Sequence, residues 1–464
     1  MRLDLHSVAA QVDRFPYKSL EDLQRGAERA GIRLPAQAET RVLATPLTIG
    51  KAVAANRLCV NPMEGCDAAR DGTPTELSLR RYARFAAGGA GVIWVEATAV
   101  CESGRGNPGQ FWLSRDSSGG LARIPEAVRA LRRNQASQGQ TPVLILQLTH
   151  SGRYSKPAGV PAPIIPVHSS VLDPLTNVSP TQPLITDAEL EGLERAYVDA
   201  ARLADEMGFD GVDVKACHGY LVHELLCARD RIGSVYGGSF ENRTRFLRNV
   251  VGAIRSEVPG LIIASRLSVY DGIPSPWGWG MKGDGTLAPD LSEPAELIGD
   301  LGKLGVEILS LAVGNPYYNP HMERPYDKPL VGGSLPSEHP MESIARLVSL
   351  FRAVRTISPR HMVLVGTGFS WLRQYLGNVG AALVQEGAID LLGVGRTAIA
   401  APWFARELIY GKALPAGDMC TACSSCSQLM RDGKPSGCIV RDSAIYAPFY
   451  RSARMSASSL EDAS

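Results

Sequence analysis

The chain has 464 residues, of which 45% are apolar and 20% charged, as in an ordinary globular protein with room for one large domain and appendages. Its formal net charge of +1 predicts no broad basic surface for nucleic acid. Because it has neither an apolar run of about 18 residues nor an apolar N-terminal signal, we expect a cytoplasmic protein without a membrane span.

Short apolar runs recur along the chain, and each is followed by an amphipathic stretch. The runs are continuous rather than alternating, as in parallel strands that are buried on both faces. The eight expected strands are 57–61, 92–95, 143–148, 211–214, 262–265, 306–310, 362–365 and 390–394. The eight expected helices are 76–87, 124–135, 187–207, 239–257, 293–304, 343–357, 371–385 and 402–409.

This strict alternation of strand and helix predicts an α/β fold, a (β/α)8 TIM barrel. A doubly wound open sheet is the competing α/β arrangement. The expected organisation is an N-terminal extension (1–45), the barrel (46–412), a four-cysteine segment (413–443) and a C-terminal tail (444–464). The extension contains an amphipathic helix over 20–30. Long loops over 270–289 and 314–340 are expected to shape a substrate pocket, because barrel active sites lie on the loops after strands.

Four of the nine cysteines lie within 19 residues, in the pattern C-x2-C-x2-C-x11-C. They are Cys420, Cys423, Cys426 and Cys438. Gaps of two residues let thiolates converge on one centre, and a fourth thiolate from beyond a loop completes a shell of four sulfurs. Clustering of so rare a residue favours a metal site over incidental cysteines, and the spacing leaves iron–sulfur and zinc open.

Two glycine-rich turns follow the last two expected strands, Gly366-Thr-Gly368 and Gly393-Val-Gly395-Arg396. Backbone N–H groups in such turns can approach an anion, and the start of the next helix adds a favourable dipole. Arg396 can bind a phosphate through parallel hydrogen bonds. The turns therefore predict a phosphate site, and tight loops with a surface arginine are the structural alternative.

Over about residues 45–410 the sequence resembles the Old Yellow Enzyme family (NADH:flavin oxidoreductases), FMN-dependent ene-reductases. Within it, the sequence is most similar to the barrel part of 2,4-dienoyl-CoA reductase and trimethylamine dehydrogenase. The matching stretches are NRLCVNPMEG (56–65), GVIWVEATAV (91–100), QLTHSGR (147–153), GFDGVDVKACHGYLVHELL (208–226), YGGSFENRTRF (236–246), ASRLS (264–268) and GVGR (393–396). The resemblance implies bound FMN and a four-iron four-sulfur (4Fe-4S) cluster on the cysteine quartet.

The resemblance also implies which residues contact the cofactor. Gln147 would pair its side-chain amide with the flavin pyrimidine, and Arg266 would place a cation beside flavin N1 and O2, where it stabilises the reduced flavin. The residues expected along the flavin edge are Pro62, Met63, Glu64 and Ala97. Those expected to hold the FMN phosphate are Gly366, Gly368, Gly395 and Arg396.

Catalytic roles follow from the same resemblance. Tyr220 is similar to the proton donor of ene-reductases, which protonates the α-carbon after hydride from flavin N5 reaches the β-carbon. His218 is similar to a residue that binds the substrate carbonyl oxygen. His321 is the candidate for a second catalytic histidine, and with Tyr317 and Tyr318 it is expected to line the pocket.

Two residues depart from the family pattern. Lys215 stands where many members carry a histidine, and Glu64 where they carry Thr, Cys or His. Lys215 could bind a substrate carboxylate or enolate, or it could pair with Asp213 or Glu64 and never touch substrate. An unpaired anion beside the flavin would lower its reduction potential, so a Glu64–Lys215 ion pair is our hypothesis. The second gap of the cysteine quartet is one residue shorter than in the relatives, so zinc stays the alternative to iron–sulfur.

The resemblance thus implies a flavoprotein that reduces the activated C=C bond of an enone, enoate or dienoyl thioester. The sequence has no G-x-G-x-x-G unit in a strand–helix context, so we expect no nucleotide-binding domains like those of the relatives. Electrons would come from NAD(P)H above the flavin, or from a separate electron-transfer protein through the cluster. The alternatives are amine oxidation, with Trp277, Trp279 and the tyrosine pair as a cage for a cation, and a barrel with structural zinc.

Overall fold

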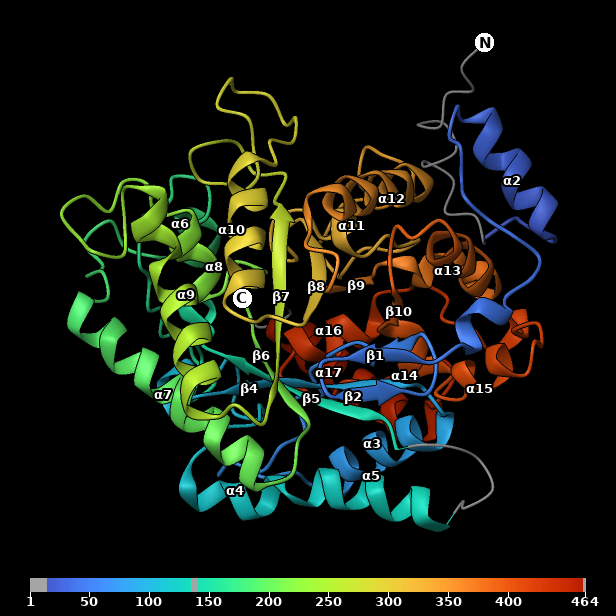
Figure 1. The fold of residues 1–464 in the computed structure, drawn as a ribbon, viewed down its shortest axis with the longest axis horizontal. Coiled ribbons are helices and arrows are strands. Elements are labelled where there is room, and N and C mark those ends of the chain that lie inside the picture. The colour runs from blue at the N-terminus through green and yellow to red at the C-terminus, as the bar shows by residue number, and fades with distance from the viewer. Residues whose placement is uncertain (1–14, 135–140, 462–464) are drawn as a thin grey trace.

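The computed structural model describes residues 15–134 and 141–461. Its eight parallel strands close into a barrel in the order β10-β3-β4-β5-β6-β7-β8-β9, with helices around it (Figure 1). This closed order confirms the TIM-barrel prediction over the open doubly wound sheet. The strands are β3 (Leu58–Val60), β4 (Val92–Ala99), β5 (Val143–Thr149), β6 (Gly211–Val214), β7 (Ile262–Tyr270), β8 (Ile308–Val313), β9 (Val363–Gly366) and β10 (Leu391–Val394).

The expected helices are present with small shifts at their ends. They are α2 (Leu20–Arg29), α3 (Glu76–Gly88), α5 (Arg123–Asn134), α7 (Asp187–Glu206), α9 (Phe240–Glu257), α10 (Ser292–Lys303), α12 (Pro340–Ile357), α13 (Leu376–Gln385) and α15 (Phe404–Ile409). The start expected at residue 371 is wrong, because the 3-10 helix η4 (Phe369–Tyr375) precedes α13 and Arg373 has a φ of 50°. Thr186 forms the capping box that opens α7.

Shorter helices lie within the loops between these elements. They are α4 (Arg115–Leu121), α6 (Asp173–Thr176), α8 (Leu221–Leu226), α11 (Pro320–Glu323) and α14 (Arg396–Ala400), with the 3-10 helices η1 (Arg41–Ala44), η2 (Glu102–Gly104), η3 (Gly152–Tyr154) and η5 (Ala416–Asp418). The cysteine region contains α16 (Ser425–Arg431) and is followed by α17 (Ser443–Glu461). No described helix combines the length and the apolar character needed to cross a bilayer.

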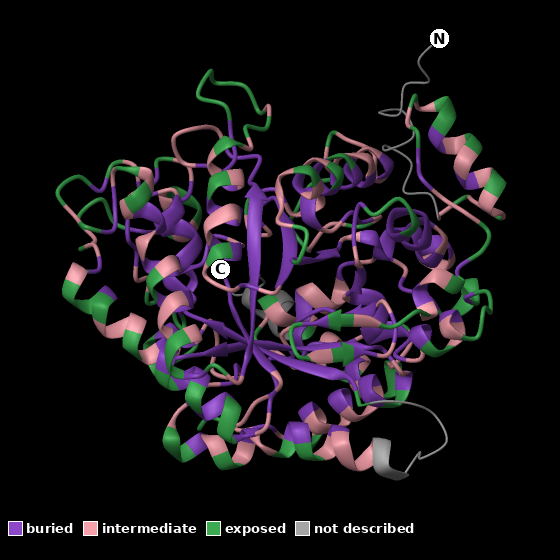
Figure 2. Cartoon of the chain, in the orientation of Figure 1, coloured by how far each residue is buried: buried purple, intermediate pink, exposed green. Residues whose placement is uncertain are grey.

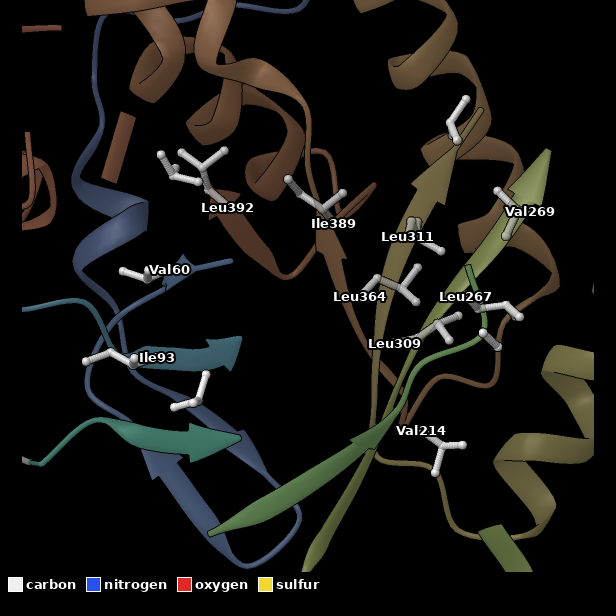
Figure 3. Close-up of a cluster of buried hydrophobic side chains, with 14 of the residues drawn as sticks. Val60, Ile93, Val214, Leu267, Val269, Leu309, Leu311, Leu364, Ile389 and Leu392 are labelled. Atoms are coloured by element: carbon white, nitrogen blue, oxygen red, sulfur yellow. The ribbon is translucent and has the colours of Figure 1, made fainter. Parts of the chain in front are cut away.

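Two apolar layers build the core. The larger one lies between the strands and the helices, and Figure 3 shows part of it, including Val60, Ile93, Leu309 and Leu364. The smaller one fills the barrel itself, where Trp94 and Ile145 pack with Ile49 of a separate hairpin. That hairpin pairs β1 (Leu47–Ile49) with β2 (Ala52–Ala54) in antiparallel fashion. The eight barrel strands are buried throughout, whereas the β1–β2 hairpin and the surrounding helices also carry exposed residues (Figure 2).

The alternation of side chains along the strands places polar groups at one end of the barrel. Side chains two positions apart share a face of a strand. The interior residues Cys59, Ile145, Ala264 and Val365 are apolar or small. Two positions after each of them, in the same order, come Asn61, Gln147, Arg266 and Thr367. The carboxyl ends of the strands therefore aim polar side chains at the barrel mouth, where barrel active sites lie.

The cysteine region is tied to the barrel by hydrogen bonds. The Ser436 backbone N–H donates to the Gly65 carbonyl at 2.6 Å. Asp442 accepts two hydrogen bonds from Arg80 of α3, at 2.8 and 3.0 Å, and a further one from Arg84. The cysteine region and α3, which are far apart in the sequence, therefore pack together beside the segment that follows β3.

Candidate active site

A cavity of about 1050 Å³, measured out to its open mouth, lies at the carboxyl ends of the strands. The predicted residues that line it are Pro62, Met63, Glu64, Gln147, Lys215, His218, Tyr220, Arg266, Gly368, Gly395, Arg396 and Cys426. Lining residues for which no role was predicted include Asn61, Glu323, Arg324, Thr367, Ser370, Met430 and Arg431. Most of the predicted site therefore converges on one cavity, which also reaches the cysteine region.

Three of the predicted catalytic and cofactor-binding residues lie elsewhere, as do the quartet cysteines other than Cys426. Ala97 is buried in β4, and its carbonyl accepts a hydrogen bond from the Gln110 side chain at 3.0 Å. A Cβ on Gly366 would meet Ile389 at 2.7 Å, so this glycine makes room for the side chain that precedes β10. His321 faces Glu338, with Nε2 and Oε1 3.5 Å apart. None of the three lines the cavity.

The expected tryptophan cage is not at this cavity either. Trp277 lines a separate small cavity beside His223 and Cys227. Trp279 is fully buried, and its backbone N–H donates to Asp271 Oδ2 at 2.8 Å. The aromatic residues on the wall of the main cavity are instead Tyr220 and Tyr317.

Asp213 organises the floor of the cavity. Its carboxylate accepts hydrogen bonds from Gln147 Nε2 at 2.6 Å, Trp94 Nε1 at 3.0 Å and the Arg266 backbone N–H at 2.7 Å. Burial raises the pKa of this carboxyl, and these donors oppose the rise. One N–H of the Gln147 amide is thus held by Asp213, and the amide oxygen remains available as an acceptor.

Glu323 links two predicted site residues. One carboxylate oxygen lies 2.9 Å from Arg266 Nη2 and 2.6 Å from His218 Nε2. Burial opposes ionisation of Glu323, but His218 and Arg266 outweigh it and lower the pKa to about 2. Burial also lowers the pKa of His218 to about 4, so its ring is neutral near pH 7. His218 Nε2 and Glu323 Oε1 are close but are not aligned as a hydrogen bond, so the neutral ring keeps an N–H that can donate to an acceptor in the cavity.

The hypothesised Glu64–Lys215 pair is present. Lys215 Nζ lies 3.8 Å from Glu64 Oε1 and 3.7 Å from the centre of the Tyr220 ring. Burial lowers the pKa of Lys215, and Glu64 opposes this. The Tyr220 hydroxyl donates to Glu64 Oε1 at 3.2 Å. Burial raises the pKa of Tyr220 well above its usual value and the Glu64 charge adds to the rise, so the phenol keeps its proton at neutral pH.

One corner of the cavity presents two arginines with spare hydrogen-bond donors. Arg396 Nη2 donates to the Pro325 carbonyl at 2.8 Å, whereas its buried Nη1 has no partner. Arg324 makes one long hydrogen bond, 3.5 Å, to Ser424 Oγ. Burial lowers the pKa of Arg324 to about 10, and the like charge of Arg396 adds to the effect. Because buried cations need partners, this corner fits the phosphate of FMN.

The glycines of this corner keep it open. Gly368 has a φ of +96°, and a Cβ there would meet Leu347 Cδ1 at 2.5 Å. A Cβ on Gly395 would meet Met63 Sδ at 2.8 Å. Both glycines are therefore required by close packing where the chain passes the expected phosphate.

Backbone N–H groups of the cysteine region donate hydrogen bonds to two of its sulfur atoms. The Ala422 backbone N–H donates to Cys420 Sγ at 3.4 Å, and that of Arg441 to Cys438 Sγ at 3.3 Å. Ala422 and Ser424 have left-handed φ values of 52° and 58°, which make the turns between the cysteines. No three of the four quartet sulfurs, all in the described part of the chain, lie within 4.8 Å of one another. A single tetrahedral zinc would need sulfurs about 3.8 Å apart, given Zn–S bonds of about 2.3 Å.

Two of the missed residues, both charged, come from one loop. Glu323 and Arg324 follow β8 in a stretch where His321 was the residue expected to act. The signal that could have found them is their charge, since a carboxylate and a guanidinium side by side after a barrel strand are typical of a site. Their direction depends on α11, a four-residue helix that begins at Pro320.

Comparisons with known proteins identify the family and the fold. The family model for "NADH:flavin oxidoreductase / NADH oxidase family" matches residues 42–278. The chain is 34% identical over 233 residues to NADPH dehydrogenase of Geobacillus thermodenitrificans, which is 50% of this chain and 64% of that protein. Its fold is similar to 2-naphthoyl-CoA reductase in complex with 2-naphthoyl-CoA (TM-score 0.68, 23% identity, 86% of this chain and 57% of the other). It is also similar to histamine dehydrogenase from Rhizobium sp. 4-9 (TM-score 0.64, 21% identity, 86% and 52%).

In each of these three comparisons the match spans less than two thirds of the other protein's length.

Proposed function

Because this chain belongs to the NADH:flavin oxidoreductase / NADH oxidase family, we propose that it is an FMN-dependent enzyme that reduces an activated C=C bond with electrons from NAD(P)H. Bound FMN supplies the hydride for this chemistry. One observation carries the proposal: a phenol that keeps its proton, Tyr220, and a neutral imidazole, His218, line the same cavity as the two phosphate-corner arginines. An acid and a carbonyl-binding group beside a flavin site are what ene-reduction requires.

Each residue that lines the cavity has a distinct proposed role. Arg396 and Arg324 would hold the phosphate, and the Gln147 amide oxygen would accept a hydrogen bond from the flavin pyrimidine. Arg266 would place its charge where the reduced ring system becomes negative. The substrate carbonyl would lie against His218 and Lys215, and Tyr220 would give its proton to the α-carbon. The apolar side chains of Met63 and Met430 border the same space.

The charges in the cavity favour this reaction over amine oxidation. Of the two carboxylates on its wall, Glu64 faces Lys215 and Glu323 faces Arg266 and His218. Arg324 and Arg396 would pair with the FMN phosphate, which leaves Arg431 as the remaining charged side chain of the lining. A cationic amine would therefore meet no unpaired carboxylate there, whereas a neutral enone or acyl thioester needs none.

Turnover of simple substrates tests the proposal. We expect the purified holoenzyme to convert 2-cyclohexen-1-one to cyclohexanone under anaerobic conditions with NADPH or NADH as the reductant. Trimethylamine and histamine, offered with an artificial electron acceptor, should not be oxidised. Amine oxidation without any enone reduction would overturn the proposal in favour of the dehydrogenase alternative.

We also propose that the cysteine quartet holds an iron–sulfur cluster that exchanges electrons between the cofactor and a separate protein. The sequence spacing C-x2-C-x2-C of the first three cysteines is a known iron–sulfur spacing. Cys426 lines the cavity, and Arg396 opposes the rise in pKa that burial causes at Cys420 and Cys426. The quartet thus adjoins the phosphate corner, close enough to serve as an electron port.

Replacing Cys423 by Ser should remove iron and acid-labile sulfide while FMN stays bound. The serine hydroxyl is a poor ligand for iron compared with a thiolate, so the fourth sulfur of the shell is lost. Metal analysis and the absorbance spectrum of anaerobically purified protein measure both cofactors. Cys101→Ser, at a half-buried cysteine outside the quartet, is the control and should keep its iron. Zinc in place of iron in the unmodified protein would contradict the electron-port proposal.

A further inference from the structure

The proposed proton donor is almost fully buried. Tyr220 is only 4% exposed. Its hydroxyl makes two contacts, one with Glu64 Oε1 and one with the Tyr317 hydroxyl, each at 3.2 Å. A phenol has one proton to donate, so while Tyr220 donates to the carboxylate it accepts from Tyr317. The Lys215 ammonium lies over the ring of Tyr220 rather than at its oxygen.

Tyr317 is fixed in place between this buried acid and the surface. Its ring stacks on Tyr154 with centroids 3.7 Å apart and 14° between the planes. The exposed Arg431 of α16 lies 4.4 Å above the Tyr317 ring and donates to the Pro316 carbonyl at 3.1 Å. The Tyr317 backbone N–H is held by Asn315 Oδ1 at 2.9 Å. Tyr317 itself is half-buried and lines the cavity, so its hydroxyl can meet water that enters at the mouth.

We propose that Tyr317 is a second catalytic residue, which returns a proton to Tyr220 after each turnover. This inference rests on the proposed function. In the reaction, the O–H bond of Tyr220 breaks and its proton forms the new C–H bond at the substrate α-carbon, which leaves a Tyr220 phenolate. The Tyr317 proton then moves to that phenolate, and water at the mouth returns a proton to Tyr317. The net proton of the product thus comes from solvent.

The surrounding charges favour transfer in this direction. Burial raises the pKa of Tyr317 to about 12, and the Arg431 guanidinium opposes the rise. Glu64 raises the pKa of both phenols, but at Tyr317 the effect of Arg431 is larger, whereas at Tyr220 Glu64 adds to the rise that burial causes. Negative charge is therefore better tolerated on Tyr317 than on Tyr220. The role predicted for His321 is thereby assigned to Tyr317, because His321 lies at Glu338 instead.

A double-mutant cycle tests the relay. Steady-state enone reduction is measured for the wild-type holoenzyme, Tyr317→Phe, Tyr220→Phe and the double variant. Phenylalanine keeps the stack on Tyr154 and removes only the hydroxyl. We expect Tyr317→Phe to lower kcat about tenfold or more in the wild-type background, and less than about twofold when Tyr220 is already Phe, because the relay acts only through Tyr220. Tyr318→Phe, at the exposed neighbour outside the cavity, is the control and should leave kcat unchanged.

Each outcome decides between the two claims. Equal losses from Tyr317→Phe in both backgrounds, or no loss in either, would overturn the relay while the enone activity of the wild type upholds the proposed function. A wild type that binds FMN but reduces no enone would overturn the proposed function and the relay together. If added imidazole, which can supply a proton, partly restored the kcat of Tyr317→Phe, the defect would be due to loss of a proton donor rather than to displacement of the aromatic ring.

Discussion

Replacing Tyr220 by Phe should slow enone reduction by about 10²–10⁴-fold, the usual contribution of a positioned general acid. The ring of Phe fills the same space, so FMN content and substrate KM should change little. Burial and Glu64 hold the proton on this phenol, so the native residue is a ready donor whereas Phe offers none. Stopped-flow mixing of the reduced holoenzyme with 2-cyclohexen-1-one measures the step directly.

The matched control for this substitution is Tyr410→Phe. Tyr410 is 57% exposed, lies outside the cavity and should show wild-type rates. If Tyr220→Phe reacted within about threefold of the wild type, general-acid catalysis by this residue would be wrong, since even a weak acid contributes more. The proton would then have to reach the substrate from water.

Replacing Arg81 by Met should lower the free energy of unfolding by about 3–5 kcal/mol, the usual cost of breaking a buried ion pair from one side. Arg81 is 5% exposed, and its guanidinium lies 2.7 Å from Asp67 Oδ2 and 2.6 Å from Glu96 Oε1. Methionine fills the space but leaves both carboxylates buried without their cation. Burial already raises the pKa of Glu96 to about 7 against the effect of Arg81, so this carboxyl would become protonated near neutral pH.

The removal of the Arg81 guanidinium should also affect the candidate active site. Glu96 Oε2 accepts the Gly65 backbone N–H at 2.6 Å, which fixes the segment that carries Pro62, Met63 and Glu64. Urea unfolding of the holoenzyme, followed by fluorescence, measures the change. Arg352→Met, at a surface pair with Glu386, is the control and should cost less than about 1 kcal/mol. A similarly small change for Arg81→Met, at an unchanged m-value, would contradict the account of this network.

The barrel and its floor could be predicted from the sequence because they depend on local, periodic signals. Continuous apolar runs separated by amphipathic stretches specify parallel strands within helices. Side-chain alternation then carries Gln147 and Arg266 to the mouth, two positions beyond interior residues. The same geometry brings Lys215 within 3.8 Å of Glu64, so the pair could be proposed from two unusual residues at strand ends.

The loop after β8 could not be predicted in the same way. The thirteen residues 315–327 include three tyrosines, a histidine, a glutamate and an arginine, and no periodic pattern indicates which of them face inward. The outcome depends on long-range contacts: Asn319 Nδ2 donates to the Asp271 carbonyl at 2.8 Å, and α11 then turns Glu323 toward Arg266. Those contacts place Tyr317 on the cavity wall and His321 against Glu338.

Reoxidation of the reduced flavin is the most direct test of the central claim. The purified holoenzyme is reduced anaerobically with one equivalent of dithionite and mixed with 2-cyclohexen-1-one, while the flavin absorbance is followed. We predict full recovery of the oxidised flavin spectrum together with one equivalent of cyclohexanone per reduced flavin. A flavin that stays reduced in the presence of enone, but is reduced from its oxidised form by an amine, would contradict the account.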